Sequence, residues 1–362
     1  MTSRLFTNRT GRAGLGLAAA AAALLLLPAG SHAQAVATEP TVDTQVKVGA
    51  GLYEVVVNES TNSIYVASTG NNDPKIFELD ATTLAEKRTI ARTDAPSFGL
   101  GINRQTQTLY TTNTRAGSVS AIDLATGQTV ATIAVESDPA AHVYRALVDE
   151  NANKVYVSVV ATPSKIWIID GATNTLEHVI EDAGGRTTGL ALDPTTNKLY
   201  AAALADNAVV EIDLATRTVA RTFPSGGERP TQMAIDPSTS RLFVTHQGTG
   251  NVVVLDVKSG EVVKDIPTDE IALGIGFDAD ADLLYVANRG GGNVTVIDTN
   301  TYDIVTTLDA GTMPNTVAID SRDGTVFVTN KARPTGRRGG AAPPPAGPDE
   351  GGDTVTRIVR SE

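Results

Sequence analysis

Seven copies of one short strand pattern recur along the chain, and this repeat constrains the fold more than any other feature. Each copy is centred on an aromatic residue, and these are Tyr65, Tyr110, Tyr156, Tyr200, Phe243, Tyr285 and Phe327. Successive aromatic residues are 45, 46, 44, 43, 42 and 42 positions apart. A period of about 40–45 residues with several short strands per repeat is typical of propeller blades. The sequence therefore predicts an all-β, seven-bladed β-propeller.

Each repeat contains four runs rich in Val, Ile, Leu and Tyr, separated by turn residues. In the fourth repeat the runs cover residues 188–193, 198–203, 208–213 and 218–223. Runs of this length with turns every 8–12 positions predict four-stranded blades. Asp or Asn ends the first and third runs, where its side chain closes a tight turn. We expect blades to begin near residues 51, 96, 142, 186, 229, 271 and 313.

The repeat region lacks one strand at its C-terminal end and has one extra strand at its N-terminal end. The last repeat has three strand-like runs and lacks a fourth, whereas residues 44–49 form a spare run before the first repeat. Pairing of this run with residues 354–359 would leave no open sheet edge between the first and last blades. The sequence therefore predicts a ring that an N-terminal strand closes by completing the last blade.

Residues 1–34 have the pattern of a secretory signal peptide. Three arginines precede an apolar run at residues 15–30, and small residues follow at Ser31, Ala33 and Ala35. The apolar run is shorter than the ~20 residues of a membrane span. We expect cleavage after Ala33 or Ala35, no membrane span, and one propeller domain over residues 35–362 in the periplasm or the external medium.

Charge and cysteine content restrict the chemistry. The formal net charge is −12, and removal of residues 1–34 leaves 26 Lys and Arg against 41 Asp and Glu. Such a surface repels anionic partners unless basic residues cluster locally. The chain has no cysteine, which excludes disulfides, thiolate metal sites, cysteine nucleophiles and a lipidated N-terminal cysteine.

The strand cores YTTN (110–113), FVTH (243–246), YVAN (285–288) and FVTN (327–330) share one pattern, and the first three are followed by a run ending in Ile-Asp or Leu-Asp. They resemble the YVTN-repeat β-propeller family, which includes YncE-like periplasmic proteins and surface-layer-type repeats. The resemblance covers residues 44–359 and implies the propeller fold. It leaves the function open, because propellers host binding, scaffolding and catalysis alike. The third and fourth repeats depart from the motif, since their cores lack the final Asn.

Known catalytic and metal-binding patterns are absent from the sequence. Two histidines, His142 and His246, fall on the same expected face, but they lack the further ligands that a zinc site needs. The acidic run 278–282 fails as a calcium loop because Leu283 and Arg289 occupy the positions of the required Gly and Glu. No phosphate-binding loop or serine-hydrolase elbow occurs. We therefore assign no catalytic residue, metal or cofactor.

The starts of the inner strands carry the strongest signal for binding. Aligning them places three aromatic residues, Tyr53, Phe98 and Tyr144, around one mouth of the propeller axis. Basic residues fall on the same face, and the tentative ligand-binding set adds Arg145, Arg186, Arg229, His246 and Arg289. Aromatic rings flanked by Arg suit single-stranded nucleic acid, because bases stack and phosphates pair. The same set suits a carboxylated glycan or an acidic peptide, and the rings have a competing interpretation as packing between blades.

The sequence favours an exported, non-catalytic binding or scaffold propeller. We expect a monomer that takes an anionic ligand, either a polymer or an envelope protein, at this mouth. Residues 331–352 form a Gly- and Pro-rich insertion that we expect to be a mobile loop. Two alternatives stay open. One is a lyase or hydrolase using Glu54, His142, Arg145 and His246, and the other is a surface-assembly protein without a small ligand.

Overall fold

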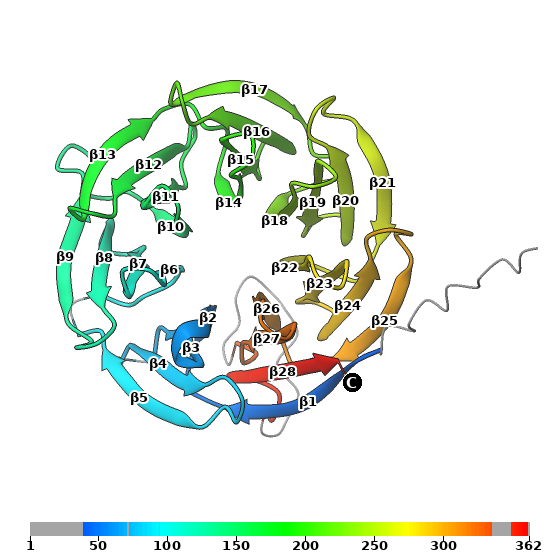
Figure 1. The fold of residues 1–362 in the computed structure, drawn as a ribbon, viewed down its shortest axis with the longest axis horizontal. Helices are drawn as coiled ribbons and strands as arrows, with labels where there is room; N and C mark the ends of the chain where they lie inside the picture. Colours follow the sequence, from blue (N-terminus) through cyan, green and yellow to red (C-terminus); the bar gives the residue numbers. More distant parts are fainter. Residues whose placement is uncertain (1–38, 71, 94, 335–348, 361–362) are drawn as a thin grey trace, which may run out of the picture. The chain divides into compact units, whose positions relative to one another are not determined.

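The computed structural model describes residues 39–70, 72–93, 95–334 and 349–360, all within one contact unit, Thr38–Glu362. Twenty-eight strands form seven separate four-stranded antiparallel sheets in this unit, arranged radially around a common axis (Figure 1). The predicted seven-bladed, four-stranded propeller is confirmed. The helical element of the described residues is a single 3-10 turn, Glu59–Thr61. The predicted signal peptide and most of the insertion 331–352 lie outside the described residues.

Within the first six blades the strands follow one another from the axis to the rim. The first blade contains β2 to β5, at Leu52–Asn58, Ser63–Ser68, Lys75–Asp80 and Glu86–Ala91. The second contains β6 to β9, at Leu100–Asn103, Thr108–Asn113, Ser118–Asp123 and Thr129–Ala134. The third contains β10 to β13, at Val143–Asp149, Lys154–Val159, Lys165–Asp170 and Thr175–Ile180.

The next three blades repeat this order. The fourth contains β14 to β17, at Thr187–Asp193, Lys198–Ala203, Ala208–Asp213 and Thr218–Pro224. The fifth contains β18 to β21, at Pro230–Asp236, Arg241–His246, Asn251–Asp256 and Val262–Pro267. The sixth contains β22 to β25, at Ala272–Asp278, Leu283–Asn288, Asn293–Asp298 and Ile304–Asp309.

The seventh blade joins the two ends of the repeat region. It contains β26 to β28, at Pro314–Asp320, Thr325–Asn330 and Thr354–Arg360, and β1, at Pro40–Lys47, as its outer strand. The register pairs Thr44 with Arg357 and Val46 with Val355. The predicted closure is therefore confirmed, although β1 begins at Pro40, four residues earlier than the pattern indicated.

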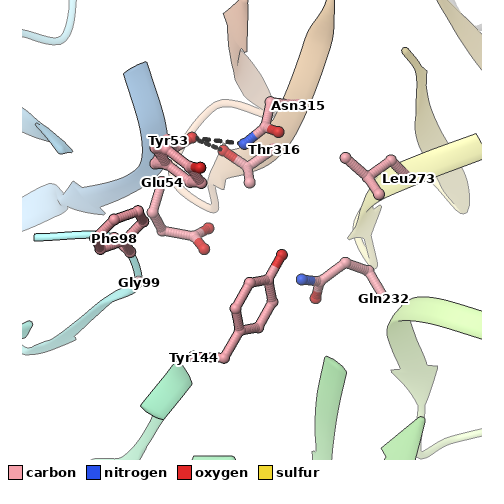
Figure 2. Close-up of a pocket in the computed structure, with 9 residues that line it drawn as sticks. All are labelled: Tyr53, Glu54, Phe98, Gly99, Tyr144, Gln232, Leu273, Asn315 and Thr316. Carbon is pink, nitrogen blue, oxygen red and sulfur yellow. Dashed lines mark hydrogen bonds between the residues drawn. The ribbon is translucent and has the colours of Figure 1, made fainter. Parts of the chain in front are cut away.

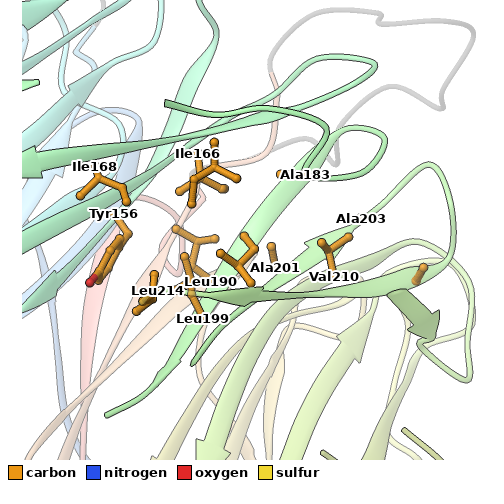
Figure 3. Close-up of a cluster of buried hydrophobic side chains, with 13 residues drawn as sticks. Tyr156, Ile166, Ile168, Ala183, Leu190, Leu199, Ala201, Ala203, Val210 and Leu214 are labelled. Atoms are coloured by element: carbon orange, nitrogen blue, oxygen red, sulfur yellow. The ribbon is translucent and has the colours of Figure 1, made fainter. Parts of the chain in front are cut away.

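Apolar side chains fill the spaces between adjacent sheets. Between the third and fourth blades, fully buried Ile166 and Ile168 belong to the same cluster as Leu190, Leu199 and Val210 (Figure 3). The outer strands contribute much less, since β5 and β9 each bury a single side chain. Face-to-face packing of this kind buries the middle strands on both sides, which explains their nearly continuous apolar runs.

Aspartates close the hairpins as the turn pattern predicted. Asp213, at the end of β16, accepts hydrogen bonds from the backbone amides of Ala215 (2.9 Å) and Thr216 (3.0 Å). Lys198 donates to the other oxygen of the same carboxylate at 2.7 Å. The Lys198 hydrogen bond, with the amides, lowers the pKa of Asp213 to about 2. The acidic residues at these positions therefore have a structural role.

The final Asn of the repeat core clamps two strands together. Asn288 lies buried at the end of β23, and its Nδ2 donates to Asn293 Oδ1 and Thr295 Oγ1, each at 2.8 Å. Asn330 donates in the same way to Thr354 and Thr356, and Asn113 to Ser118 and Ser120. In the fourth blade the Asn is replaced by Ala203, and the two facing positions are Ala208 and Val210. In the fourth blade, therefore, the Asn and both of its partners are replaced together by apolar residues.

The closing strand should contribute strongly to stability. We predict that a chain starting at Val48 unfolds more readily than one starting at Glu39, because loss of β1 exposes the edge of β28. The free energy of unfolding should fall by roughly 3 kcal/mol or more, since several ladder hydrogen bonds are lost at ~1 kcal/mol each. Urea unfolding of both chains measures the difference, and equal midpoints would contradict a closed ring.

The Asn clamp gives a second prediction. Asn288→Ala should lower the free energy of unfolding by about 1–3 kcal/mol, because Asn293 and Thr295 lose their buried donor. Adding Thr295→Val should recover part of this loss, because it recreates the apolar arrangement of the fourth blade. Urea unfolding of both variants tests this, and a double variant that is no more stable than Asn288→Ala would argue against coupling.

Candidate ligand-binding site

A small pocket lies on the propeller axis where the inner strands begin. Its lining comes from the third and fourth positions counted from the blade starts at residues 51, 96, 142, 229, 271 and 313, which we call the third and fourth inner-strand positions. Every blade except the fourth contributes (Figure 2). The space open to the centre of a water molecule is about 20 Å³. This is enough for about one water. The lining residues are Tyr53, Glu54, Phe98, Gly99, Tyr144, Gln232, Leu273, Asn315 and Thr316.

The three predicted aromatic residues meet at this pocket. The rings of Tyr53 and Phe98 make an edge-on contact with centroids 4.7 Å apart. Tyr53 also packs against the apolar cluster between the first two blades, so it has both of the roles that the sequence left open. The hydroxyl of Tyr144 points into the pocket (Figure 2). Burial, reinforced by the charge of Glu54, raises the pKa of Tyr144.

Two cations from neighbouring loops lie over the rings. Lys331, which follows β27, places its Nζ 3.0 Å from the ring centroid of Tyr53. Arg115, which follows β7, places its guanidinium carbon 5.7 Å from the centroid of Phe98. Contacts of this kind are favourable because the ring face carries partial negative charge. The aromatic residues therefore hold basic side chains at the mouth.

Arg289 is the least compensated charge at the mouth. It follows β23 directly and is largely buried, and its Nε has no hydrogen-bond partner. Burial lowers the pKa of Arg289, while the Tyr144 and Tyr53 hydroxyls oppose this shift. Within the described part of the chain no carboxylate forms an ion pair with it. A desolvated cation without a counter-ion is costly, so this position is suited to an anion.

Glu54 is the one carboxylate that lines the pocket. Only 5% of this residue is exposed, and its Oε2 lies 2.5 Å from Nη1 of Arg145. Burial raises the pKa of Glu54, and the Arg145 guanidinium opposes that shift. Arg145 therefore lies at the site as predicted, but its charge is shared with Glu54, and its Nε has no partner.

Two of the predicted arginines lie elsewhere on the surface. Arg186 immediately precedes β14, Arg229 immediately precedes β18, and both are exposed. Their φ angles of +54° and +57° place them in left-handed turns, and neither lines the pocket. Arg145 and Arg289 do not line the pocket either, but Arg145 pairs with the lining residue Glu54, and Arg289 lies near Tyr144 and Tyr53.

His246 requires a correction. The sequence placed it among the ligand-binding residues of the mouth, but it is fully buried at the end of β19, in the position that Asn occupies in the second, sixth and seventh blades. It is therefore not accessible to a ligand at the mouth. Burial lowers the pKa of His246 to about 4, and the Asp265 carboxylate opposes the shift.

The pocket also contains residues that the sequence did not single out. Gln232, Leu273, Asn315 and Thr316 occupy the third and fourth inner-strand positions of the last three blades. The alignment of inner strands that located Tyr53 could have predicted them, since they occupy the same aligned positions as Tyr53 and Glu54. Among the described residues, no three His, Asp or Glu side chains gather as a metal site, and no helix is long and apolar enough to cross a bilayer.

Comparison with known proteins agrees with this geometry. Residues 39–278 match the family model described as YNCE-like beta-propeller. The chain belongs to the YNCE-like β-propeller family. It is 31% identical over 175 residues to the "Uncharacterized protein YncE" of Escherichia coli (strain K12), covering 46% of this chain and 49% of the relative. The protein of the same name from Salmonella typhi is 33% identical over 163 residues, covering 42% and 46%. The matches thus span about half the length of these YncE proteins.

The buried histidine makes stability depend on pH. Since the folded pKa of His246 is below its ordinary value, its contribution is complete above pH ~6.5 and is lost as pH falls toward about 4. We predict that His246→Asn removes a decline of up to ~3 kcal/mol between these values. Urea unfolding at both pH values, with His178→Asn on β13 as the control, measures this. A decline identical to that of the unsubstituted protein would show that His246 is not its source.

Proposed function

We propose that this protein is an exported binding module that holds an anionic ligand at the mouth described above. The observation that carries the proposal is Arg289, a partly buried residue whose Nε is buried without a hydrogen-bond partner and which has no acidic partner among the described residues. A carboxylate, sulfate or phosphate group on a ligand would supply the missing counter-ion and the missing acceptor. Because the chain has a net charge of −12, most of its surface repels anions, and a local cation of this kind would direct an anionic ligand to the mouth.

The surrounding rings indicate a second feature of the ligand. Tyr53 and Phe98 form one wall of the mouth, with Lys331 and Arg115 over their faces. A planar or apolar group beside the anionic group would pack on this wall and bury area there. Single-stranded nucleic acid, an acidic glycan and an acidic protein segment each combine these two properties.

The small pocket volume favours a ligand that lies across the mouth rather than one that threads the axis. Arg186 and Arg229 lie outside the pocket and are exposed, so they would contact a ligand that extends beyond it. An extended polymer or a partner protein fits this arrangement better than a small metabolite. The predicted signal peptide supports a location in the periplasm or outside the cell.

A catalytic role has one observation in its favour. Glu54 is a buried carboxyl with a raised pKa, which is a property of many general acids and bases. Against it, Arg145 holds the carboxylate at 2.5 Å, and the pocket lining contains no second carboxyl and no histidine. Binding without chemistry is therefore the better supported function.

Substitution of Arg289 tests the proposal. Binding of a labelled single-stranded oligonucleotide, an oligogalacturonate and a poly-glutamate peptide is measured by fluorescence anisotropy at low and high salt. Arg289→Met should weaken binding of the ligand that is recognised about tenfold or more and reduce its salt dependence, because one charge-assisted contact is lost. Arg217→Met, on the turn between β16 and β17, is the control and should bind normally. Unchanged binding by Arg289→Met, or no binding of any of the three, would contradict the proposal.

A further inference from the structure

Glu54 occupies the place that the anionic group of a ligand would take. We infer that the Glu54 carboxylate is an internal counter-ion, which the anionic group of the ligand displaces from Arg145 as Glu54 takes up a proton. This inference rests on the proposed function and adds a specific consequence to it: binding of the ligand is coupled to protonation of one side chain.

Glu54 lines the pocket and is held by its ion pair with Arg145. Its carboxylate points toward the space between Phe98 and Tyr144 (Figure 2). The Arg145 side chain that pairs with it is 22% exposed, so part of it is accessible to solvent. A guanidinium has five donors, and the Nε of Arg145 is buried without a partner. Arg145 could therefore bind an incoming anion through the same guanidinium that now holds Glu54.

Burial makes the charge of the Glu54 carboxylate costly. Glu54 has lost most of its hydration, so its charge depends on Arg145 for compensation. A second anion arriving at Arg145 or Arg289 would repel the ionised carboxylate in a medium of low dielectric constant. Two anions that share one cation favour protonation of one of them. A neutral Glu54 carboxyl removes the repulsion and offers an O–H donor to the ligand.

The groups that face Glu54 leave few other candidates for this proton. Strand β10 contributes Arg145 and Tyr144, and β2 contributes Tyr53. The remaining inner strands contribute non-ionising side chains, namely Gln232 from β18, Leu273 from β22, and Asn315 and Thr316 from β26. The cations around the mouth are Arg289, Lys331 and Arg115. Tyr, Lys and Arg side chains ordinarily titrate above pH 9 or so, well outside the range of a carboxyl.

His142 is the nearby group that requires a control. It lies two residues before Tyr144 with much of its surface exposed, and the partial desolvation of its ring together with the Arg186 charge lowers its pKa. Its titration would overlap that of a carboxyl with a raised pKa. Because it does not line the pocket, replacing it should leave the coupling intact.

The direction of the pH effect follows from linkage. If bound anion raises the pKa of Glu54 further, then protonation of Glu54 must raise the affinity for the anion by the same factor. Affinity should therefore increase as pH falls from neutral toward the pKa of Glu54 in the free protein, and then level off.

Benzenesulfonate is a suitable probe, because it joins an aromatic ring to an anion whose charge is constant over this pH range. Isothermal titration calorimetry at pH ~7 and pH ~5, in buffers of different ionisation enthalpy, gives affinity and proton uptake together. The unsubstituted protein should bind several-fold more tightly at the lower pH and take up protons. Glu54→Gln should bind tightly at both values without proton uptake, and His142→Gln should behave as the unsubstituted protein does.

The outcomes separate this inference from the proposed function. If Arg289→Met abolishes binding while the unsubstituted protein and Glu54→Gln share one pH profile, the proton coupling is wrong and the anion site stands. If benzenesulfonate binds to none of the proteins at either pH, both are wrong. Proton uptake on benzenesulfonate binding is measured with the unsubstituted protein alone. If that protein binds the probe without taking up protons, the coupling is wrong even if Glu54→Gln fails to fold.

Discussion

The carbonyl oxygen of the third inner-strand residue is the point on which the geometry of the mouth depends. At five of the junctions between blades a side-chain hydroxyl from the preceding blade donates to it. These bonds join Thr112 to Tyr144 (2.8 Å), Ser158 to Thr188 (2.9 Å), Thr188 to Thr231 (3.0 Å), Thr245 to Leu273 (2.8 Å) and Thr329 to Tyr53 (2.7 Å). Most donors are the Thr or Ser that precedes the last residue of the repeat core. The repeat motif therefore fixes the backbone from which the ligand-facing side chains project.

The same carbonyl determines which residues fit at the fourth inner-strand position. A Cβ on Gly99 would lie 2.2 Å from the Tyr144 oxygen, and one on Gly189 would lie 2.3 Å from the Thr231 oxygen. The second, fourth and sixth blades all have Gly at this position, whereas the others have Glu54, Arg145, Gln232 and Thr316. Polar side chains thus project from the first, third, fifth and seventh blades, and Gly99 in the second blade leaves room for the Glu54–Arg145 pair to form across it.

The sequence was sufficient to predict the number of blades, the closing strand and the inner-strand positions that surround the mouth. All three follow from the repeat period and from the alternation of side chains along a strand. The depth of His246 was not, because the repeat gives its place at the end of a strand but not the fact that this place is buried. Arg186 and Arg289 look equivalent as basic residues near the axis. They differ because Arg186 lies in a left-handed turn that exposes its side chain, whereas Arg289 follows the clamped Asn288 and packs near Tyr144 and Tyr53.

A backbone with sevenfold repetition therefore supports a site without symmetry. Rings come from the first three blades and amides from the fifth and seventh, so a ligand meets a different surface on each side of the axis. The negative charge of the whole protein acts against an anion only within about one Debye length, ~10 Å at 0.1 M salt. Inside that range Arg145, which pairs with the buried Glu54, and Arg289, whose Nε is buried, lie near the lining residues, where Coulomb interactions are stronger than in bulk water. If the mouth binds an anion as proposed, short-range geometry decides its recognition, and an anion without a matching planar group gains little against the surrounding acidic surface.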